Sequence, residues 1–272
     1  MKTRTVAGAV LVSVLLLVVL VLPKEAAAVI MGLLQAVATY ELLFRTGLVK
    51  KVKLVVISAI AAFLMAIWSF YDAVRAWYVL LVLAYFLAMI TQMMRDHVKM
   101  RFETLSMCFV GGLIVPYLMS SVVRILAMPI GRYVILIPFV IACVCDAGAY
   151  FIGIKFGKHK LAPVVSPNKT IEGALGGIAT GVVAMLVYTL VLDLGFPQLD
   201  VNYGAAAVYG MLGCLVGELG DLCFSVIKRQ TGIKDYGNLI PGHGGVLDRF
   251  DSILTVAPLV EALLLLWPVI VA

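Results

Sequence analysis

Charged residues are scarce in this chain. Asp, Glu, Lys and Arg make up 13% of its 272 residues, about half of the share found in ordinary soluble domains. The mean hydropathy is +1.10. This composition excludes a soluble globular protein and indicates an integral membrane protein. Because the chain has no soluble domain, we expect its net charge of +6 to face an anionic lipid leaflet, and we expect no nucleic-acid partner.

Several familiar motifs are also missing. The five cysteines form no CxxC pair, and they all lie in apolar runs, so we interpret them as small packing residues. The sequence has no HExxH zinc motif and no Walker A loop. It shows no linker, no low-complexity segment and no clear internal repeat that would indicate a transporter built from duplicated halves.

Long apolar runs, in contrast, recur along the whole chain. A helix needs about 20 apolar residues to cross a bilayer. The sequence therefore predicts an all-α, polytopic membrane protein with about nine transmembrane helices, at 6–22, 26–44, 52–70, 77–94, 105–126, 133–154, 175–194, 205–227 and 253–272. Prolines weaken the fifth and sixth of these predictions, because Pro116, Pro129 and Pro138 could break or kink the helices.

The distribution of positive charge predicts the orientation. With nine spans, all but four of the 21 lysines and arginines fall on the side of the N-terminus, and the exceptions are Lys24, Arg75, Arg124 and Arg132. The positive-inside rule then places the N-terminus and the charged loops in the cytoplasm. The first run lacks a convincing cleavage pattern, so we expect a retained helix rather than a signal peptide.

Three acidic residues lie inside predicted spans, near their cytoplasmic ends. Asp146 belongs to the sixth span, and Glu218 and Asp221 share one face of the eighth because they are three residues apart. All three lie roughly 9–14 Å deep, where ionisable groups usually mark a functional site. Oxygen ligands at one depth suit Mg²⁺. Hydrogen bonds between helices, or a cation-coupled transporter, are alternatives that explain the acids alone.

Two cytoplasmic loops look suited to binding phosphate. In the first, at 155–174, we predict that Ser166 is a helix N-cap and Pro167 the first helical residue. The N–H groups that follow, at Asn168 and Lys169, would then favour an anion. Glu172 could close the cap or help to hold a metal. A capped helix with a solvated lysine is the alternative interpretation.

The second loop is the charged segment 225–251, "SVIKRQTGIKDYGNLIPGHGGVLDRFD", called the signature segment below. Its cations can pair with phosphate charges, and its GHGG run lets backbone N–H groups approach an anion. Asp248 lies just before the last span, so we predict that it lies within reach of Asp221. A run of solvated positive charge explains this alternation of acids, bases and glycines poorly.

The signature segment resembles that of the phosphatidate cytidylyltransferase (CDP-diacylglycerol synthase) family. The matching positions are Ser225, Lys228, Arg229, Lys234, Asp235, His243, Gly244, Gly245, Asp248, Arg249 and Asp251. The stretches "DAGAYFIGIKFGKHKLAP" and "SPNKTIEG" before it also resemble the family. The likeness is good from Asp146 to the C-terminus, whereas the first half matches only as generic membrane helices.

The resemblance implies that CTP and phosphatidic acid react to give CDP-diacylglycerol and pyrophosphate, with Mg²⁺ required and room for a second cation, monovalent or divalent. We expect Asp221 and Asp248 to be metal ligands, and Asp146 and Glu218 to complete a second cation site. The expected substrate-binding and catalytic residues are Ser166, Asn168, Lys169, Lys228, Arg229, Lys234, His243, Gly244, Gly245 and Arg249. The family also leads us to expect a homodimer in the cytoplasmic membrane of a bacterium, with its active site facing the cytoplasm.

The sequence further suggests that the two halves of the chain have different roles. Residues 1–130 are expected to form a lipid-embedded scaffold with possible dimer contacts, and residues 131–272 a catalytic region with signature loops at 155–174 and 228–252. A CDP-alcohol phosphotransferase is a rival among membrane enzymes, but its D-G-x-x-A-R pattern is absent. A relative that uses another lipid or a polyprenol as acceptor stays open.

Overall fold

The computed structural model describes residues 2–71, 75–96, 100–240 and 242–271 of the chain. Within these residues, seven helices are long and apolar enough to cross a membrane, and they account for seven of the nine predicted spans: Lys24–Arg45, Val52–Phe70, Trp77–Arg95, Phe102–Ala127, Gly131–Phe156, Ile171–Gly195 and Tyr203–Gln230. The first and last predicted spans appear as shorter apolar helices, at Val10–Val21 and Ile253–Leu266. The prediction of a polytopic helical membrane protein is therefore confirmed, and the number of spans stays a prediction.

The chain forms two compact units. One contains Met1–Ala127 and Gln230–Phe250, and the other contains Met128–Arg229 and Asp251–Ala272. Most of the charged loop between the eighth and ninth predicted spans thus belongs to the same unit as the N-terminal helices. The functional division at residue 130 stays a prediction.

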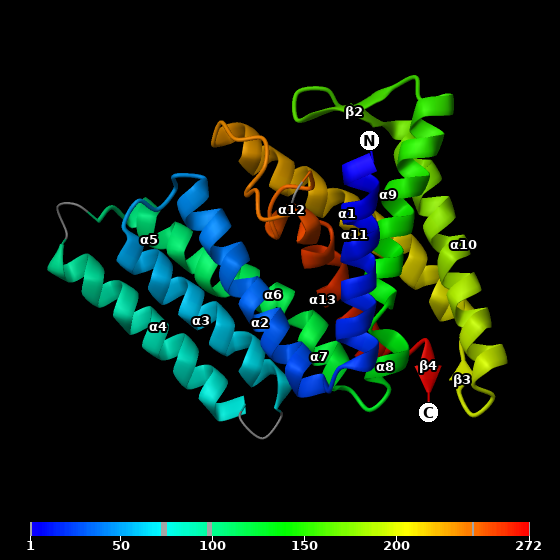
Figure 1. The fold of residues 1–272 in the computed structure, drawn as a ribbon, viewed down its shortest axis with the longest axis horizontal. Coiled ribbons are helices and arrows are strands. Elements are labelled where there is room, and N and C mark those ends of the chain that lie inside the picture. The colour runs from blue at the N-terminus through cyan, green and yellow to red at the C-terminus, as the bar shows by residue number, and fades with distance from the viewer. Residues whose placement is uncertain (1, 72–74, 97–99, 241, 272) are drawn as a thin grey trace. The chain divides into compact units, whose positions relative to one another are not determined.

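The first unit is built from helices. Figure 1 shows α2, α3 and α4 side by side. In chain order its elements are α1 (Lys2–Leu16), η1 (Leu17–Val21), α2 (Lys24–Tyr40), η2 (Glu41–Arg45), α3 (Val52–Phe70), α4 (Arg75–Arg95), α5 (Phe102–Phe109), η4 (Val110–Ile114), α6 (Val115–Met119), α7 (Ser121–Ala127) and α12 (Leu247–Phe250). The η elements are π-helical turns.

Hydrogen bonds of a buried tyrosine connect three helices in the core of this unit. The hydroxyl of Tyr85 donates to the carbonyl oxygen of Cys108 at 2.7 Å and lies 2.7 Å from the hydroxyl of Ser58. All three residues are buried. Because an unpaired hydroxyl is costly in an apolar core, this network fixes α4 against α3 and α5.

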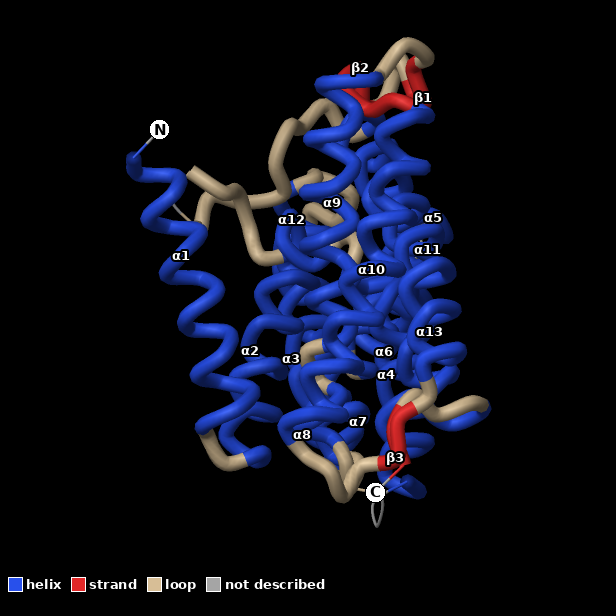
Figure 2. The backbone as a smooth tube through the Cα atoms, turned by 90° about the vertical axis from the view of Figure 1, so that its right-hand side faces the viewer, coloured by secondary structure: helices blue, strands red, loops and turns tan. Residues whose placement is uncertain are grey.

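The second unit combines long helices with two short hairpins. Its elements are α8 (Gly131–Val134), α9 (Ile137–Phe156), β1 (Lys160–Ala162), β2 (Ser166–Thr170), α10 (Ile171–Gly195), β3 (Asp200–Val201), α11 (Tyr203–Gln230), α13 (Ile253–Leu266) and β4 (Ile270–Val271). Strands β1 and β2 pair antiparallel, as do β3 and β4. Figure 2 shows the β1–β2 hairpin beyond one end of α9 and α10, and β3 beyond the other end.

Proline and strand pairing explain where the helices differ from the predicted runs. The fifth run is divided into α5, η4, α6 and α7, with Pro116 just after the π-helical turn. The sixth run breaks between α8 and α9, just before Pro138. The ninth run ends as a helix at Leu266, because Ile270 and Val271 pair with β3 instead.

Glycines on one face of α11 let neighbouring helices approach closely. A Cβ atom on Gly210 would lie 2.7 Å from the carbonyl oxygen of Gly181 and 2.7 Å from Cα of Val182, both in α10. One on Gly213 would lie 2.9 Å from the side chain of Ile141 in α9. Since backbone atoms cannot move aside as a flexible side chain can, the α10–α11 contact depends on glycine at position 210.

We predict that Gly210→Ala destabilises the protein. The added methyl group must push α11 away from the backbone of α10, and overpacking of this kind costs about 1–3 kcal/mol. Thermal unfolding of the purified protein in detergent would show a lower Tm. The matched control is Gly195→Ala at the end of α10, where a Cβ atom meets nothing within 4 Å. An unchanged Tm for Gly210→Ala would contradict the close approach of the two helices.

Candidate active site

A polar cavity of about 490 Å³ lies in the second unit. Its walls come from the last turns of α9, the β1–β2 hairpin and the first turn of α10, with one residue from α11. The polar residues that line it include Asp146, Tyr150, Lys160, Asn168, Lys169, Thr170 and Glu218. Two predicted metal ligands and two predicted substrate-binding residues therefore share one cavity.

The start of α10 differs from the prediction. Ser166 and Pro167 do not cap the helix, because residues 166–170 form strand β2, with Ser166 opposite Ala162 and Thr170 opposite Lys160. The N-cap is Thr170, whose Oγ1 accepts a hydrogen bond from the N–H of Gly173 at 3.1 Å. Asn168 and Lys169 thus extend from a hairpin strand, and the N–H groups that open the helix follow Thr170.

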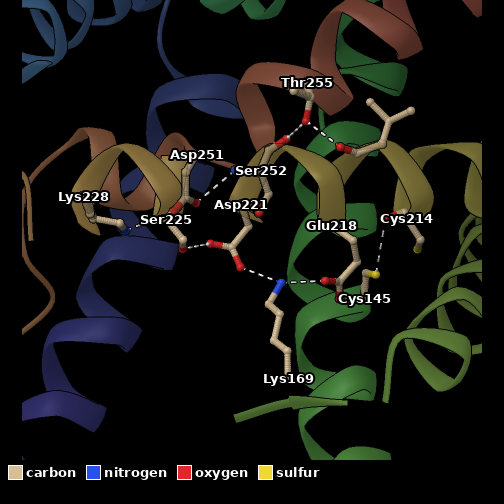
Figure 3. Close-up of polar contacts among 11 residues, drawn as sticks. Cys145, Lys169, Cys214, Glu218, Asp221, Ser225, Lys228, Asp251, Ser252 and Thr255 are labelled. Carbon is tan, nitrogen blue, oxygen red and sulfur yellow. Dashed lines mark hydrogen bonds and ion pairs between the residues drawn. The ribbon is translucent and has the colours of Figure 1, made fainter. Parts of the chain in front are cut away.

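Lys169 lies between two carboxylates of α11. Its Nζ is 2.5 Å from Oε2 of Glu218 and 2.6 Å from Oδ2 of Asp221, as Figure 3 shows. Burial lowers the pKa of the Lys169 ammonium, but Asp221 and then Glu218 raise it by more, so the net pKa lies above the ordinary value for lysine. The lysine is therefore charged at neutral pH and compensates the two acids.

The same contacts confirm that Glu218 and Asp221 share one face of their helix, because both reach one ammonium group. Ser225, one turn further along α11, donates from Oγ to Oδ1 of Asp221 at 3.4 Å. Asp146, on α9, lines the same cavity as Glu218 and has an exposed side chain. Two acids thus contact Lys169, Ser225 contacts one of them, and Asp146 lines the same cavity as Lys169.

A second ion pair lies next to this cluster. Lys228 at the end of α11 is 3.7 Å from Asp251, and both side chains are mostly buried. Burial raises the pKa of Asp251 to about 7, with a further contribution from the negative charge of Asp221 and an opposing one from Lys228. The structure thus places Lys228, predicted to bind phosphate, beside a carboxylate.

Glu172 closes the base of the hairpin. Its carboxylate accepts hydrogen bonds from the backbone N–H groups of Lys158 and His159, at 3.0 and 3.2 Å, and contacts Nδ1 of His159 at 2.6 Å. Of the two predicted roles, a cap or a metal ligand, the structure shows a capping role, although for the turn before β1 rather than for α10.

In the first unit, buried carboxylates organise the loop that carries the GHGG run. Oδ2 of Asp248 accepts hydrogen bonds from the N–H groups of Tyr236 and Gly245, at 2.8 and 2.9 Å. Asp248 itself is 5% exposed. The amide of Gly245, which we predicted to bind phosphate, thus donates to a carboxylate in this structure, and its binding of phosphate stays a prediction. Asp248 and Asp221 belong to different units, and their proximity stays a prediction.

The remaining predicted residues of this loop are more accessible. Lys234 and Arg249 are exposed, and His243 and Gly244 are half-buried. Gly244 has a φ of 83°, a left-handed conformation that favours glycine. The ring of His243 lies beside α1, because a Cβ atom added to Gly8 would be 3.6 Å from Nε2 of His243. In the second unit, exposed Arg229 donates from Nε to the carbonyl oxygen of Val165 at 3.3 Å.

Sequence analysis missed Glu41 altogether. This residue is 3% exposed and accepts hydrogen bonds from the N–H groups of Val246 and Leu247, at 3.1 and 2.8 Å. It stands in an apolar run, and a single acid inside a predicted span was the signal available.

The described residues contain no group of three histidine, cysteine or acidic side chains close enough to hold a metal ion by themselves. Any ion at this site would therefore need ligands from substrate or water in addition to the carboxylates of α11. That requirement is met by magnesium, which usually binds through one or two carboxylates, several waters and substrate phosphates.

Comparison with known proteins identifies the family. Residues 2–267 match the sequence profile of the Cytidylyltransferase family. The chain belongs to this family. The match covers both units, including the first half, where the resemblance seen in the sequence was only generic. Membership of the cytidylyltransferase family also confirms the resemblance drawn from the signature segment.

Named relatives match part of the chain. A phosphatidate cytidylyltransferase of Staphylococcus epidermidis is 46% identical over 134 residues, which are 49% of each chain. Proteins of the same name from Staphylococcus haemolyticus and Staphylococcus aureus are 42% and 44% identical over 135 residues, 50% of each chain. The aligned part spans about half the length of these curated relatives.

We predict that Lys169→Met destabilises the protein by about 1–3 kcal/mol, because Glu218 and Asp221 then repel each other without a partner. The triple variant that also carries Glu218→Gln and Asp221→Asn should recover most of this loss. Thermal unfolding in detergent tests both, with Lys158→Met, an exposed lysine of the same region, as the control. Equal Tm values for the single and triple variants would contradict this account, because the two acids without their lysine would then cost no stability.

Proposed function

We propose that this protein condenses CTP with phosphatidic acid to give CDP-diacylglycerol and pyrophosphate, as part of phospholipid synthesis. The observation that supports this most directly is the ammonium of Lys169 held between two carboxylates at the wall of a polar cavity. Carboxylates and a lysine arranged in this way can bind a cation and phosphate groups together. Membership of the cytidylyltransferase family and the names of the Staphylococcus relatives support the same reaction.

The proposed chemistry is an in-line displacement at phosphorus. A phosphate oxygen of phosphatidic acid forms a bond to the α-phosphorus of CTP, and the bond from that phosphorus to the bridging oxygen of the β-phosphate breaks, so pyrophosphate leaves with the electron pair. A phosphate monoester is already ionised near neutral pH. The protein therefore needs no dedicated general base, and its main tasks are to position two anions and reduce their repulsion.

Magnesium fits the donor set of α11. The oxygens of Glu218 and Asp221 converge on one point, which the ammonium of Lys169 occupies. We propose that these two carboxylates would hold Mg²⁺ together with substrate phosphates, and that Asp146 contributes to a second cation site in the same cavity. A bound Mg²⁺ would neutralise charge on the reacting phosphates. The role of Asp248 as a further ligand stays a prediction from sequence.

Lys169 then has two roles in our proposal. Without substrate it compensates Glu218 and Asp221. When a cation and CTP bind, its ammonium would pair with a phosphate instead, so the buried acids are compensated in both states. We propose that Asn168 and Ser166 of β2 contact substrate from the hairpin wall, and that Lys228, Arg229, Lys234, His243, Gly244 and Arg249 bind phosphate groups as the family resemblance implies.

We also propose how the protein lies in the cell. The positive loops would face the cytoplasm, with the N-terminus inside, in the cytoplasmic membrane of a bacterium. The lipid substrate would enter sideways from the membrane, which explains acids at head-group depth. A homodimer is the expected assembly, and chemical cross-linking in native membranes tests it.

We predict that Asp221→Asn lowers the rate of pyrophosphate release from CTP about 100-fold or more, because one of two converging carboxylates is lost from a preorganised charged site. The assay uses purified protein in mixed micelles with Mg²⁺, and it compares reactions with and without phosphatidic acid. Asp193→Asn is the control, since Asp193 lies near the far end of α10 and accepts a hydrogen bond from Tyr203.

The wild-type protein should release pyrophosphate only when phosphatidic acid is present. If it releases none, the proposed reaction is wrong, and a cation-coupled transporter becomes the better explanation of the buried acids. Wild-type release that is equal without the lipid would instead indicate another acceptor.

Orientation gives a separate prediction. A cysteine in place of Val164, which is 89% exposed at the hairpin tip, should react with a membrane-impermeant maleimide in inverted membrane vesicles but not in intact spheroplasts. Gly195→Cys, at the other end of α10, should show the opposite pattern. Both variants are made in a protein without its native cysteines. Labelling of Val164→Cys in intact spheroplasts would contradict the cytoplasmic location of the cavity.

A further inference from the structure

Glu41 lies where α2 passes into the π-helical turn η2. Its two carboxylate oxygens have separate partners: Oε1 accepts from the N–H of Val246, and Oε2 accepts from the N–H of Leu247. These partners are about 200 positions away along the chain. A single side chain of the second predicted span therefore holds the start of α12.

The loop is shaped to admit this carboxylate. Added Cβ atoms on Gly237 and Gly245 would both collide with the carboxylate of Glu41. Glycine at these positions thus lets the backbone close around the acid. This close fit accounts for two glycines of the signature segment by packing, without any contact to a substrate.

Glu41 and Asp248 together accept hydrogen bonds from the N–H groups of three consecutive residues. Gly245 donates to Asp248, and Val246 and Leu247 donate to Glu41. Asp248 also accepts from Tyr236, on the other arm of the loop. Two buried carboxylates thus determine the path of the backbone immediately before Asp248 and Arg249, and one of them comes from outside the signature segment.

The donor pattern requires an acceptor at both oxygens. An ionised carboxylate accepts at each of them, whereas an amide side chain would present an NH₂ group to one of the two N–H donors. A buried donor left without an acceptor is costly, and more so in a dry environment. The charge of Glu41 is therefore suited to hold this backbone in one conformation.

We propose that Glu41 is a positioning residue of the transferase. Its carboxylate fixes the backbone of residues 245–247, so that Asp248 and Arg249 are held ready to act on substrate. This inference rests on the proposed function, in which Arg249 binds phosphate, and on the role of Asp248 as a metal ligand that is predicted from the sequence. Glu41 itself is buried and accepts hydrogen bonds from backbone N–H groups, and it is not proposed to touch substrate.

The test compares Glu41→Gln and Glu41→Asp with the wild-type protein, and Glu25→Gln is the control. Glu25 is an exposed acid at the start of the same helix, so its replacement removes an equal charge. We expect Glu41→Gln to lower kcat about 10–100-fold, with a much smaller change in KM for CTP. Glu41→Asp keeps two acceptor oxygens and should retain more activity than Glu41→Gln. Rates are expressed per folded protein, measured by monodisperse elution in detergent.

Limited trypsin digestion gives a readout that does not depend on activity. Cleavage after Lys234 and Arg249, followed by mass spectrometry, should be faster in Glu41→Gln than in the wild-type and Glu25→Gln proteins, because the loop is released from α2. Cleavage after Lys158, which lies between α9 and β1 in the second unit, is the internal reference and should not change.

The outcomes separate this proposal from the proposed function. If the wild-type protein does not use CTP and phosphatidic acid, the proposed function fails, and the digestion alone decides whether Glu41 holds the loop. If wild type is active, a wild-type kcat for folded Glu41→Gln overturns the positioning role. An unchanged cleavage rate after Lys234 and Arg249 also overturns it, whatever the activity.

Discussion

A carboxylate surrounded by hydrocarbon needs a counter-charge or N–H donors, and this requirement organises both units of the protein. In the second unit, Glu218 and Asp221 meet the ammonium of Lys169. In the first, Glu41 and Asp248 meet backbone amides that are buried with them. Removing one partner leaves the other with its full desolvation cost. Glu41, Glu218 and Asp221 therefore each constrain a segment that is far from them in sequence.

The same need to compensate a buried carboxylate affects both the stability of the fold and the proposed reaction. Lysine, arginine and magnesium can each compensate a carboxylate, but they differ in charge, size and ligand geometry. In our proposal, the ammonium of Lys169 compensates Glu218 and Asp221 before substrate binds. A metal cation can then replace this lysine, so that neither carboxylate is left without a positive partner. In our proposal, two anionic substrates then approach each other in a cavity whose charges are already arranged, and such preorganised charge is the main source of catalysis in phosphoryl and nucleotidyl transfer.

The sequence was most informative where one physical effect dominates. Seven of the nine predicted apolar runs form long helices in the described residues, because a backbone exposed to lipid must satisfy its own hydrogen bonds. The spacing of Glu218 and Asp221 predicted their shared face because helix geometry fixes it. The start of α10 was predicted wrongly, because Ser-Pro is a common signal for a helix N-cap. The local sequence does not show that residues 166–170 pair with β1 and form a strand.

Long-range pairing explains the other misses. Local pattern could not show that the amides of Gly245 and Leu247 donate to carboxylates, because Glu41, the acceptor for Leu247, lies 206 positions earlier. The binding of phosphate by the GHGG run stays a prediction. The role of Glu41 could not be read from spacing, because only the folded chain shows which backbone it meets. A lone acid near the end of an apolar helix was a signal that a partner existed, without indicating its identity.

The central claim is that the cytidylyl group of CTP, including its α-phosphate, is transferred to a lipid phosphate. The most direct test incubates the wild-type protein with phosphatidic acid, Mg²⁺ and CTP labelled either at the α-phosphate or at the γ-phosphate, and then counts the label in the chloroform-extracted lipid. We predict that α-label enters the lipid and γ-label stays in water-soluble pyrophosphate. Label from the γ-position in the lipid, or no lipid label from either position, would contradict the account.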